Sequence, residues 1–88
     1  MKWYYLTFRS VTVAQRGEGV LRRKGVDCTL QRAPRWMEER GCGYALRVRQ
    51  KDMEASVAIL RESGVLFSKI YEKEADGTVQ EVTHDLFG

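Results

Sequence analysis

A single cysteine lies between two glycines near the middle of this 88-residue chain. Gly41 and Gly43 flank Cys42, and Arg40 precedes the first glycine. Glycine has no side chain, so both neighbours leave room to approach the thiol and allow backbone angles that other residues avoid. Nearby cations stabilise a thiolate and lower the pKa of a cysteine, and the thiolate is the nucleophilic form. The pattern therefore predicts a reactive thiol at Cys42.

Further arginines could contribute to the same site. Arg35 lies in the segment that leads to Cys42, and Arg47 lies on the strand that should follow it. The candidate binding residues around the thiol are therefore Arg35, Arg40, Gly41, Gly43 and Arg47. An alternative is equally open from the residues alone. Free cysteine is among the most buried residue types, so Cys42 could be a small apolar residue at the end of a strand.

The remaining residue types argue against several other kinds of site. One histidine and two distant cysteines do not supply the four closely spaced ligands of structural zinc, so we expect no metal. The chain has no phosphate-cradling glycine loop and no paired-carboxylate signature, so we expect no cofactor. His84 stands beside Asp85, but a lone histidine in a tail is usually solvated. These residues indicate no classical catalysis, so we expect that the protein is not an enzyme.

Length and composition indicate one globular domain. Hydrophobic residues make up 43% of the chain and charged residues 31%, which is typical of a folded protein. No apolar run approaches the roughly 18–20 residues that cross a bilayer, and the first residues do not resemble a secretion signal. Two cysteines do not make a disulfide framework, which fits a reducing compartment. We therefore expect a cytoplasmic protein, whose net charge of +3 permits an anionic partner without requiring one.

Hydrophobic periodicity predicts the element order β-α-β-β-α-β. Tyr4, Leu6 and Phe8 alternate with other residues in a first strand, Ser10 is a helix N-cap, and Gly25 can end that helix. The other predicted elements are strands at 26–31, 44–49 and 65–71 and a helix at 52–63. Inside the first helix, Gly17 and Gly19 each cost about 1 kcal/mol relative to alanine. They mark either close packing or a weak point.

This order predicts a ferredoxin-like α/β plait. Its sheet has four antiparallel strands in the order 4-1-3-2, and its two helices cover one face. Residues 1–74 form this domain, and residues 75–88 form a C-terminal extension. Asp76-Gly77 is a hairpin signal, so the extension either returns as an extra strand over 78–83 or is partly disordered.

Cys28 has a different predicted role from Cys42. It alternates with polar residues in the second strand, so a core thiol is favoured. A register that keeps the apolar faces together pairs Cys28 with Leu46 or Val48. That register leaves Cys42 about four strand residues, or roughly 13 Å, away. A disulfide needs Cα atoms within about 7 Å, so we expect no Cys28–Cys42 bridge.

The first and third strands place aromatic residues and arginines opposite the apolar face. Trp3 and Tyr5 lie on this side of the first strand, and Arg47 and Arg49 on this side of the third. The simplest interpretation is a solvated face with cross-strand charge pairs. The alternative is a binding surface for an anion or for a second copy of the chain, since aromatics and arginine are enriched at interfaces. A homodimer through these four residues is one expected assembly.

RNA-recognition modules have the same element order, and residues 40–47 match much of their third-strand motif. In such a module the third and fifth motif positions face RNA, which here would turn Tyr44 outward and bury Arg47. Burying an unpaired arginine is costly, whereas the opposite facing hides Tyr44 and exposes Arg47. Nucleic-acid binding is therefore disfavoured. A non-catalytic protein- or RNA-binding module that acts through the open sheet face is kept as the alternative function.

Several short motifs follow one another along the chain between Tyr4 and Tyr71. After the aromatic first strand they are Leu21-Arg22-Arg23-Lys24-Gly25-Val26, Pro34-Arg35, Cys42-Gly43-x-Ala45-Leu46-Arg47-Val48 and Glu62-Ser63-Gly64-Val65. With these motifs the chain resembles a family of short bacterial proteins described as selenium- or sulfur-carrier-like. The resemblance implies that Cys42 carries sulfur or selenium as a persulfide or selenopersulfide. It also implies sulfur- or selenium-donor and acceptor proteins as partners.

Overall fold

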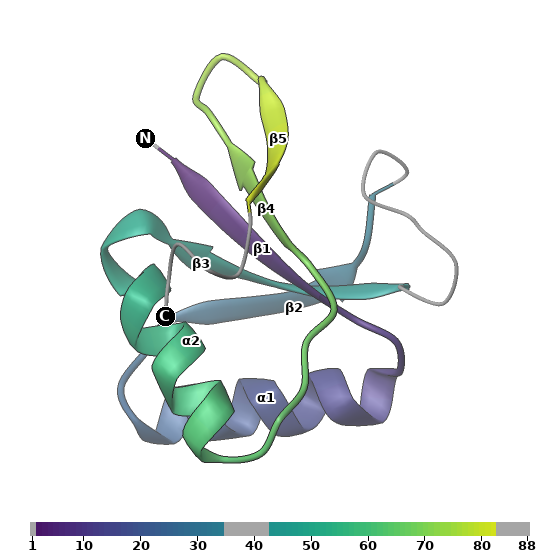
Figure 1. The fold of residues 1–88 in the computed structure, drawn as a ribbon, viewed down its shortest axis with the longest axis vertical. Helices are drawn as coiled ribbons and strands as arrows, with labels where there is room; N and C mark the ends of the chain where they lie inside the picture. The colour runs from purple at the N-terminus through teal and green to yellow at the C-terminus, as the bar shows by residue number, and fades with distance from the viewer. Residues whose placement is uncertain (1, 35–42, 83–88) are drawn as a thin grey trace.

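The computed structural model describes residues 2–34 and 43–82, and residues 1, 35–42 and 83–88 lie outside this description. The fold is α+β, with a five-stranded sheet and two α-helices (Figure 1). The elements are β1 (Trp3–Phe8), α1 (Val11–Arg23), β2 (Cys28–Arg32), β3 (Tyr44–Arg49), the 3₁₀ turn η2 (Gln50–Asp52), α2 (Met53–Glu62), β4 (Ile70–Lys73) and β5 (Val79–Val82). No helix in the described ranges is long and apolar enough to cross a membrane.

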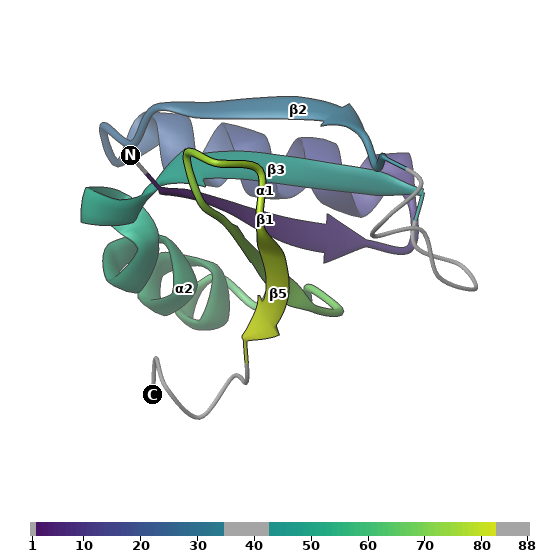
Figure 2. The same cartoon turned by 90° about the horizontal axis from the view of Figure 1, so that it is seen from above.

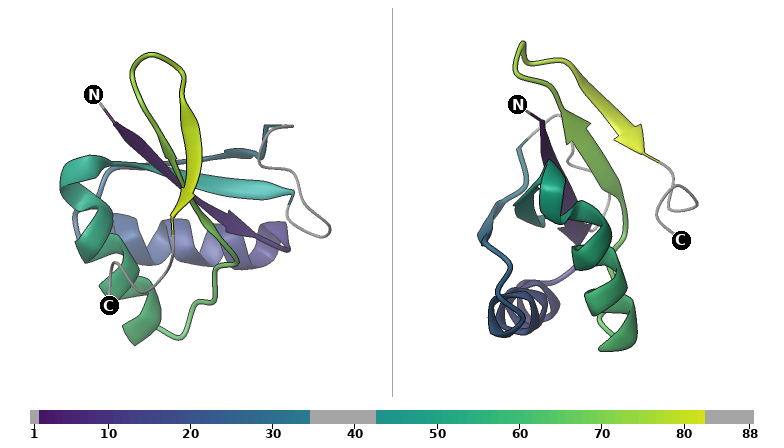
Figure 3. Two further views of the ribbon diagram at one scale, coloured as in Figure 1. Left: turned by 45° about the horizontal axis from the view of Figure 1, so that its top comes forward. Right: turned by 90° about the vertical axis from the view of Figure 1, so that its left-hand side faces the viewer.

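The sheet order is β2-β3-β1-β4-β5, and every neighbouring pair is antiparallel. β1 lies between β3 and β4, with β2 beyond β3, as the sequence predicts for its four strands. The sheet has five strands rather than four, because the chain turns at Asp76-Gly77 and returns as β5 beside β4. Gly77 has a φ of 93°, and the Asp76 carboxylate accepts a hydrogen bond of 2.8 Å from the Thr78 amide. The β4–β5 hairpin projects beyond the other strands in Figures 1 and 3.

Helix α1 begins and ends at the residues that its capping signals predict. The Ser10 hydroxyl accepts a hydrogen bond of 3.2 Å from the Val13 amide, which satisfies a backbone donor of the first turn. At the other end, Gly25 has a φ of 83°, a conformation that costs glycine little. The buried side of the helix packs against the sheet. Figure 2 shows α1 running behind β2 and β3.

The predicted fourth strand at 65–71 is wrong over residues 65–69, because β4 begins only at Ile70 and runs to Lys73. Helix α2 ends at Gly64, whose φ is 71°, and the Val65 amide then donates back to the Leu60 carbonyl over 2.9 Å. Val65 therefore belongs to the helix cap and cannot use that donor in a ladder. Its side chain is buried, but the next residue, Leu66, is 83% exposed. Residues 65–69 thus connect α2 to β4 and belong to neither element.

Buried side chains gather on both faces of the sheet. The larger cluster lies between the sheet and the helices and includes Leu6, Leu46 and Leu60, none of which is exposed. A smaller cluster lies on the opposite, helix-free face and consists of Tyr5, Ala45 and Tyr71, with Trp3, Ala33 and Val79 packed against it. Tyr5 is only 5% exposed, so the expectation of an exposed tyrosine on this face is wrong. Its neighbours on β3 and β4 bury it.

Candidate functional site

The predicted thiol site is only partly within the described residues. Cys42, Arg35, Arg40 and Gly41 lie outside them, whereas Gly43 and Arg47 are described. Only these two residues of the predicted site can therefore be placed in the fold. Gly43 precedes the first residue of this strand, and Arg47 lies in its second half.

Gly43 is held at the end of the sheet by β2. The Ala33 amide donates a hydrogen bond of 3.0 Å to the Gly43 carbonyl, which extends the β2–β3 ladder by one step. The next pair in the ladder is Arg32 and Tyr44, and the Arg32 guanidinium lies 5.5 Å from the centre of the Tyr44 ring. Arg32 is thus a cation at the ladder step next to Gly43, the residue that follows Cys42 in the sequence. Sequence reasoning did not single it out, because its role depends on the cross-strand register.

Arg47 contacts an aromatic residue of the neighbouring strand. Its guanidinium carbon lies 4.3 Å from the centre of the Trp3 ring, which is a close cation–π contact. The Nε atom of Arg47 is buried and has no hydrogen-bond partner in the part of the chain that the structure describes. Leaving such a donor unsatisfied costs about 1–3 kcal/mol. Arg47 follows Gly43 by four residues, or about 13 Å of strand. The structure therefore brings Arg47 to Trp3 and not to Gly43.

A pocket of about 240 Å³ opens beside this contact, at the β2 edge of the helix-free face. We call it the arginine pocket. Its lining includes Trp3, Arg22, Asp27, Cys28, Arg47 and Arg49. Arg49 lies opposite Trp3 in the β1–β3 ladder, and its guanidinium carbon is 5.7 Å from the centre of the ring. The sequence predicted that Trp3, Arg47 and Arg49 share a face, but the pocket also needs the end of α1, which supplies Arg22.

Cys28 is a free, buried thiol, as predicted. It stands opposite Val48 in the β2–β3 ladder, which confirms one of the two predicted pairings. Burial raises the pKa of the Cys28 thiol, and the nearby charge of Arg22 only opposes this shift. A buried thiol with a raised pKa is a poor nucleophile at neutral pH. Cys28 is therefore a core residue.

A buried carboxylate joins β1, β4 and β5 at the other side of the sheet. The Glu72 carboxylate accepts a hydrogen bond of 2.7 Å from the Tyr4 hydroxyl and one of 3.3 Å from the side-chain amide of Gln80. Lys2 Nζ lies 3.5 Å from the same carboxylate. The Tyr4 hydrogen bond is the largest cause that lowers the pKa of Glu72. Burial, together with this carboxylate, raises the pKa of Tyr4 to about 12. The sequence offered no signal for this pair, whose members stand 68 residues apart.

Among the described residues, no group of three or more histidine, cysteine, aspartate or glutamate side chains is placed to hold a metal ion. The fold and these contacts define a small α+β protein with an arginine pocket on its sheet and a cysteine-bearing connection into β3. A family model described as "Putative Se/S carrier protein-like" matches residues 3–72, and the chain belongs to this family. Comparison with curated proteins gave no match, and comparison with solved structures gave none either.

Proposed function

We propose that the protein is a sulfur or selenium carrier whose Cys42 thiol holds the transferred atom. The observation that carries this proposal is the family match over residues 3–72, a range that includes Cys42 and the whole of β3. The family's description supplies the cargo class. The residues around Cys42 supply the chemistry, because a thiol between two glycines and close to Arg40 is suited to nucleophilic attack.

The transfer needs no cofactor in the carrier. In loading, the Cys42 thiolate attacks the outer sulfur of a donor persulfide. A new sulfur–sulfur bond forms to Cys42, the donor's own sulfur–sulfur bond breaks, and the donor cysteine leaves as a thiolate. In unloading, an acceptor nucleophile attacks the outer sulfur of the Cys42 persulfide, and Cys42 leaves as the thiolate. Atoms and electrons balance in both steps, and selenium follows the same scheme as a selenopersulfide.

The described part of the chain supports this role in two ways. Arg32 lies at the ladder step after Gly43, so its charge favours an anionic sulfur in the adjoining connection. Cys28 is buried and stands about 16 Å of strand away from Gly43, since its ladder partner Val48 is five residues further along β3. At that distance Cys28 is unsuited to attack a persulfide on Cys42 and release the cargo prematurely.

The alternative of an RNA-binding sheet face has less support. In RNA-recognition modules, exposed aromatic side chains on the sheet stack on bases. On the helix-free face the two central strands carry Tyr5 and Ala45 instead, and both are buried. Trp3 remains partly accessible, but it is already in contact with Arg47. The described face therefore offers no row of free aromatic rings.

The proposal is tested by loading the protein with a cysteine desulfurase and cysteine and measuring the intact mass. We expect the wild type to gain the mass of one sulfur atom, which a thiol reductant then removes. Cys28→Ala is the matched control, because it removes the buried thiol and should still gain sulfur. Cys42→Ser should gain none. Peptide mapping after alkylation locates the added atom, and selenocysteine in place of cysteine tests selenium.

Two results would contradict the carrier role. The first is a wild-type protein that gains no sulfur while the desulfurase itself is loaded. The second is an equal gain in Cys42→Ser, which would move the cargo to another residue. Circular dichroism of both cysteine variants shows whether they are folded, so that a missing signal can be assigned to the thiol.

A further inference from the structure

The arginine pocket carries a surplus of positive charge. Arg22 has partners, because it donates a hydrogen bond of 2.6 Å to the Cys28 carbonyl and lies 3.6 Å from the Glu18 carboxylate. Arg47 and Arg49 form no salt bridge with any residue in the ranges 2–34 and 43–82. Asp27 also lines the pocket, but it forms no salt bridge with them there. Two guanidinium groups thus line the pocket without a counter-ion among the described residues.

One of these guanidinium groups also has an unused hydrogen-bond donor. The Nε atom of Arg47 is out of contact with water and has no acceptor among residues 2–34 and 43–82. Trp3 holds the same guanidinium in place from 4.3 Å, so its direction is fixed before a ligand arrives. The planar fork of arginine donors matches the oxygens of phosphate and carboxylate groups in pairs. An oxyanion bound to the guanidinium groups from the pocket would supply the missing counter-charge.

The size of the pocket limits the ligand. Its volume of about 240 Å³ is several times the roughly 30 Å³ that a water molecule occupies in the liquid. It is smaller than the roughly 300–1,000 Å³ of pockets that enclose drug-sized ligands. A dinucleotide or a folded peptide segment would not be enclosed. A small anion of a few heavy atoms fits.

We propose that the arginine pocket binds a small tetrahedral oxyanion, either free phosphate or the phosphate group of a small metabolite, between Arg47 and Arg49 beside Trp3. The described lining residues of this site do not include Cys42, and the proposal does not depend on the carrier role. The side chains that would contact the anion come from β1 and β3, which are neighbours in the sheet. Trp3 lies opposite Arg49, and Arg47 is two residues before Arg49.

The test is a titration of the full-length protein with sodium phosphate at constant ionic strength, with chloride as the balancing anion. Two-dimensional NMR follows the side-chain Nε–H signal of Arg47 and the indole N–H signal of Trp3. Both signals should move along a saturable curve. Charge-assisted hydrogen bonds favour binding enough that Arg47→Met should weaken phosphate affinity about tenfold or more, as read from Trp3. Arg47→Lys keeps the charge, loses the fork, and should also weaken binding.

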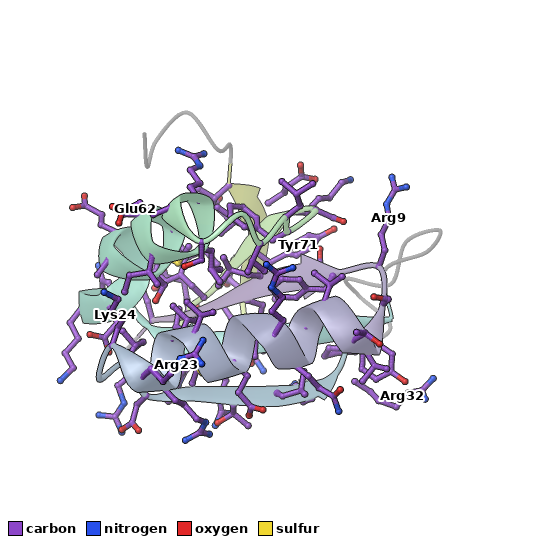
Figure 4. All side chains as sticks on the ribbon, turned by 90° about the horizontal axis from the view of Figure 1, so that it is seen from below. Arg9, Arg23, Lys24, Arg32, Glu62 and Tyr71 are labelled. Atoms are coloured by element: carbon purple, nitrogen blue, oxygen red, sulfur yellow. The ribbon has the colours of Figure 1, made fainter. Side chains whose placement is uncertain are left out.

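Arg32→Met is the matched control, since it removes the same charge from an arginine that also contacts an aromatic ring. Figure 4 shows Arg32 at the end of the molecule away from Lys24, which follows α1. Its phosphate affinity should stay within about twofold of wild type, because Arg32 is three residues from Thr29, the ladder partner of Arg47. Three strand residues span about 10 Å, which exceeds the Debye length of about 8 Å. Equal weakening in Arg32→Met and Arg47→Met would overturn the site, as would a titration that never saturates. A second titration with glycerol phosphate distinguishes the sources: tighter binding assigns the site to a phosphorylated metabolite, and equal binding assigns it to free phosphate.

Discussion

Gly17 and Gly19 form a matched pair for testing how closely α1 packs against the sheet. Both lie inside the helix, where alanine is more stable than glycine by about 1 kcal/mol. A β-carbon added at Gly17 would lie 3.2 Å from Leu46 Cδ1 and 3.3 Å from Leu60 Cδ2. A β-carbon added at Gly19 would meet no atom within 4 Å. The two substitutions therefore share a gain in helix stability and differ in packing.

The crowding at Gly17 falls on side chains that cannot move into solvent. Leu46, Leu60 and the third neighbour, Phe8, are all fully buried. Extra methyl groups in a well-packed core typically cost about 1–3 kcal/mol. After subtraction of the helical gain, Gly17→Ala should be neutral to about 2 kcal/mol less stable than wild type. Gly19→Ala should be about 1 kcal/mol more stable.

Urea denaturation followed by circular dichroism measures both free energies of unfolding under one condition. We expect the two variants to differ by about 1–3 kcal/mol. In a thermal scan, Gly19→Ala should melt about 4–8 °C above wild type for a domain of this size. Equal stabilisation by both substitutions would refute the close approach of α1 to Leu46 and Leu60. A loss at Gly19 would refute the open helix face there.

Three further predictions concern single side chains. Tyr4→Phe should lower the free energy of unfolding by about 1.5–3 kcal/mol at neutral pH. Folding lowers the pKa of Glu72, so its hydrogen bond with Tyr4 contributes fully to stability above the unfolded-state pKa. This contribution is lost as the pH falls through the folded-state pKa. The loss of stability in Tyr4→Phe should therefore be smaller in urea curves at about pH 3 than at pH 7. In the variant Cys42→Ser the only remaining thiol is the buried Cys28. A thiol reagent should react with it slowly near pH 8 and rapidly after urea is added. Fast reaction in buffer without urea would contradict the burial of Cys28. Ser10→Ala should cost about 1 kcal/mol in the same urea assay, because it removes the cap of α1, and an unchanged midpoint would argue against the cap.

The elements that the sequence predicted well have strong local signals. The Ser10 hydroxyl caps the start of α1, and Gly25 takes the left-handed backbone conformation that ends it. Each signal depends on a single residue. The pairing of Cys28 with Val48 follows from keeping apolar residues on one side of two strands, since a one-residue slip would turn every side chain to the wrong face. The turn at Asp76-Gly77 is equally local. These features need no knowledge of distant contacts.

The features that the sequence did not predict depend on contacts between distant segments. Tyr5 alternates like an exposed residue, yet Tyr71 of β4 lies opposite it and helps to bury it. Val65 looks like part of a strand, yet its amide completes the cap of α2. The Tyr4–Glu72 hydrogen bond needs β1 and β4 to be neighbours in register. In each case the partner is chosen by the register of the sheet, which a local pattern does not reveal.

The structure changes the role expected for Arg47 of β3. The sequence suggested that Arg47 helps to lower the pKa of Cys42, whereas the structure brings its guanidinium to Trp3, and its backbone stands about 13 Å of strand from Gly43. Charges further apart than about 8 Å are largely screened at physiological ionic strength. Arg47→Lys and Arg47→Met should therefore change the pKa of the Cys42 thiol by less than about half a unit.

The pKa is measured from the pH dependence of alkylation in a Cys28→Ala background, where Cys42 is the only thiol. Arg32→Met in the same background is the contrasting variant, because Arg32 lies at the ladder step beside Gly43 and should raise the pKa when it is removed. A rise of about one unit in Arg47→Met, with none in Arg32→Met, would restore Arg47 to the thiol site. A rise in Arg32→Met with none in Arg47→Met would instead support a thiol site that is independent of the arginine pocket. Substitutions at independent sites have additive effects, so Cys42→Ser should leave phosphate affinity within about twofold of wild type.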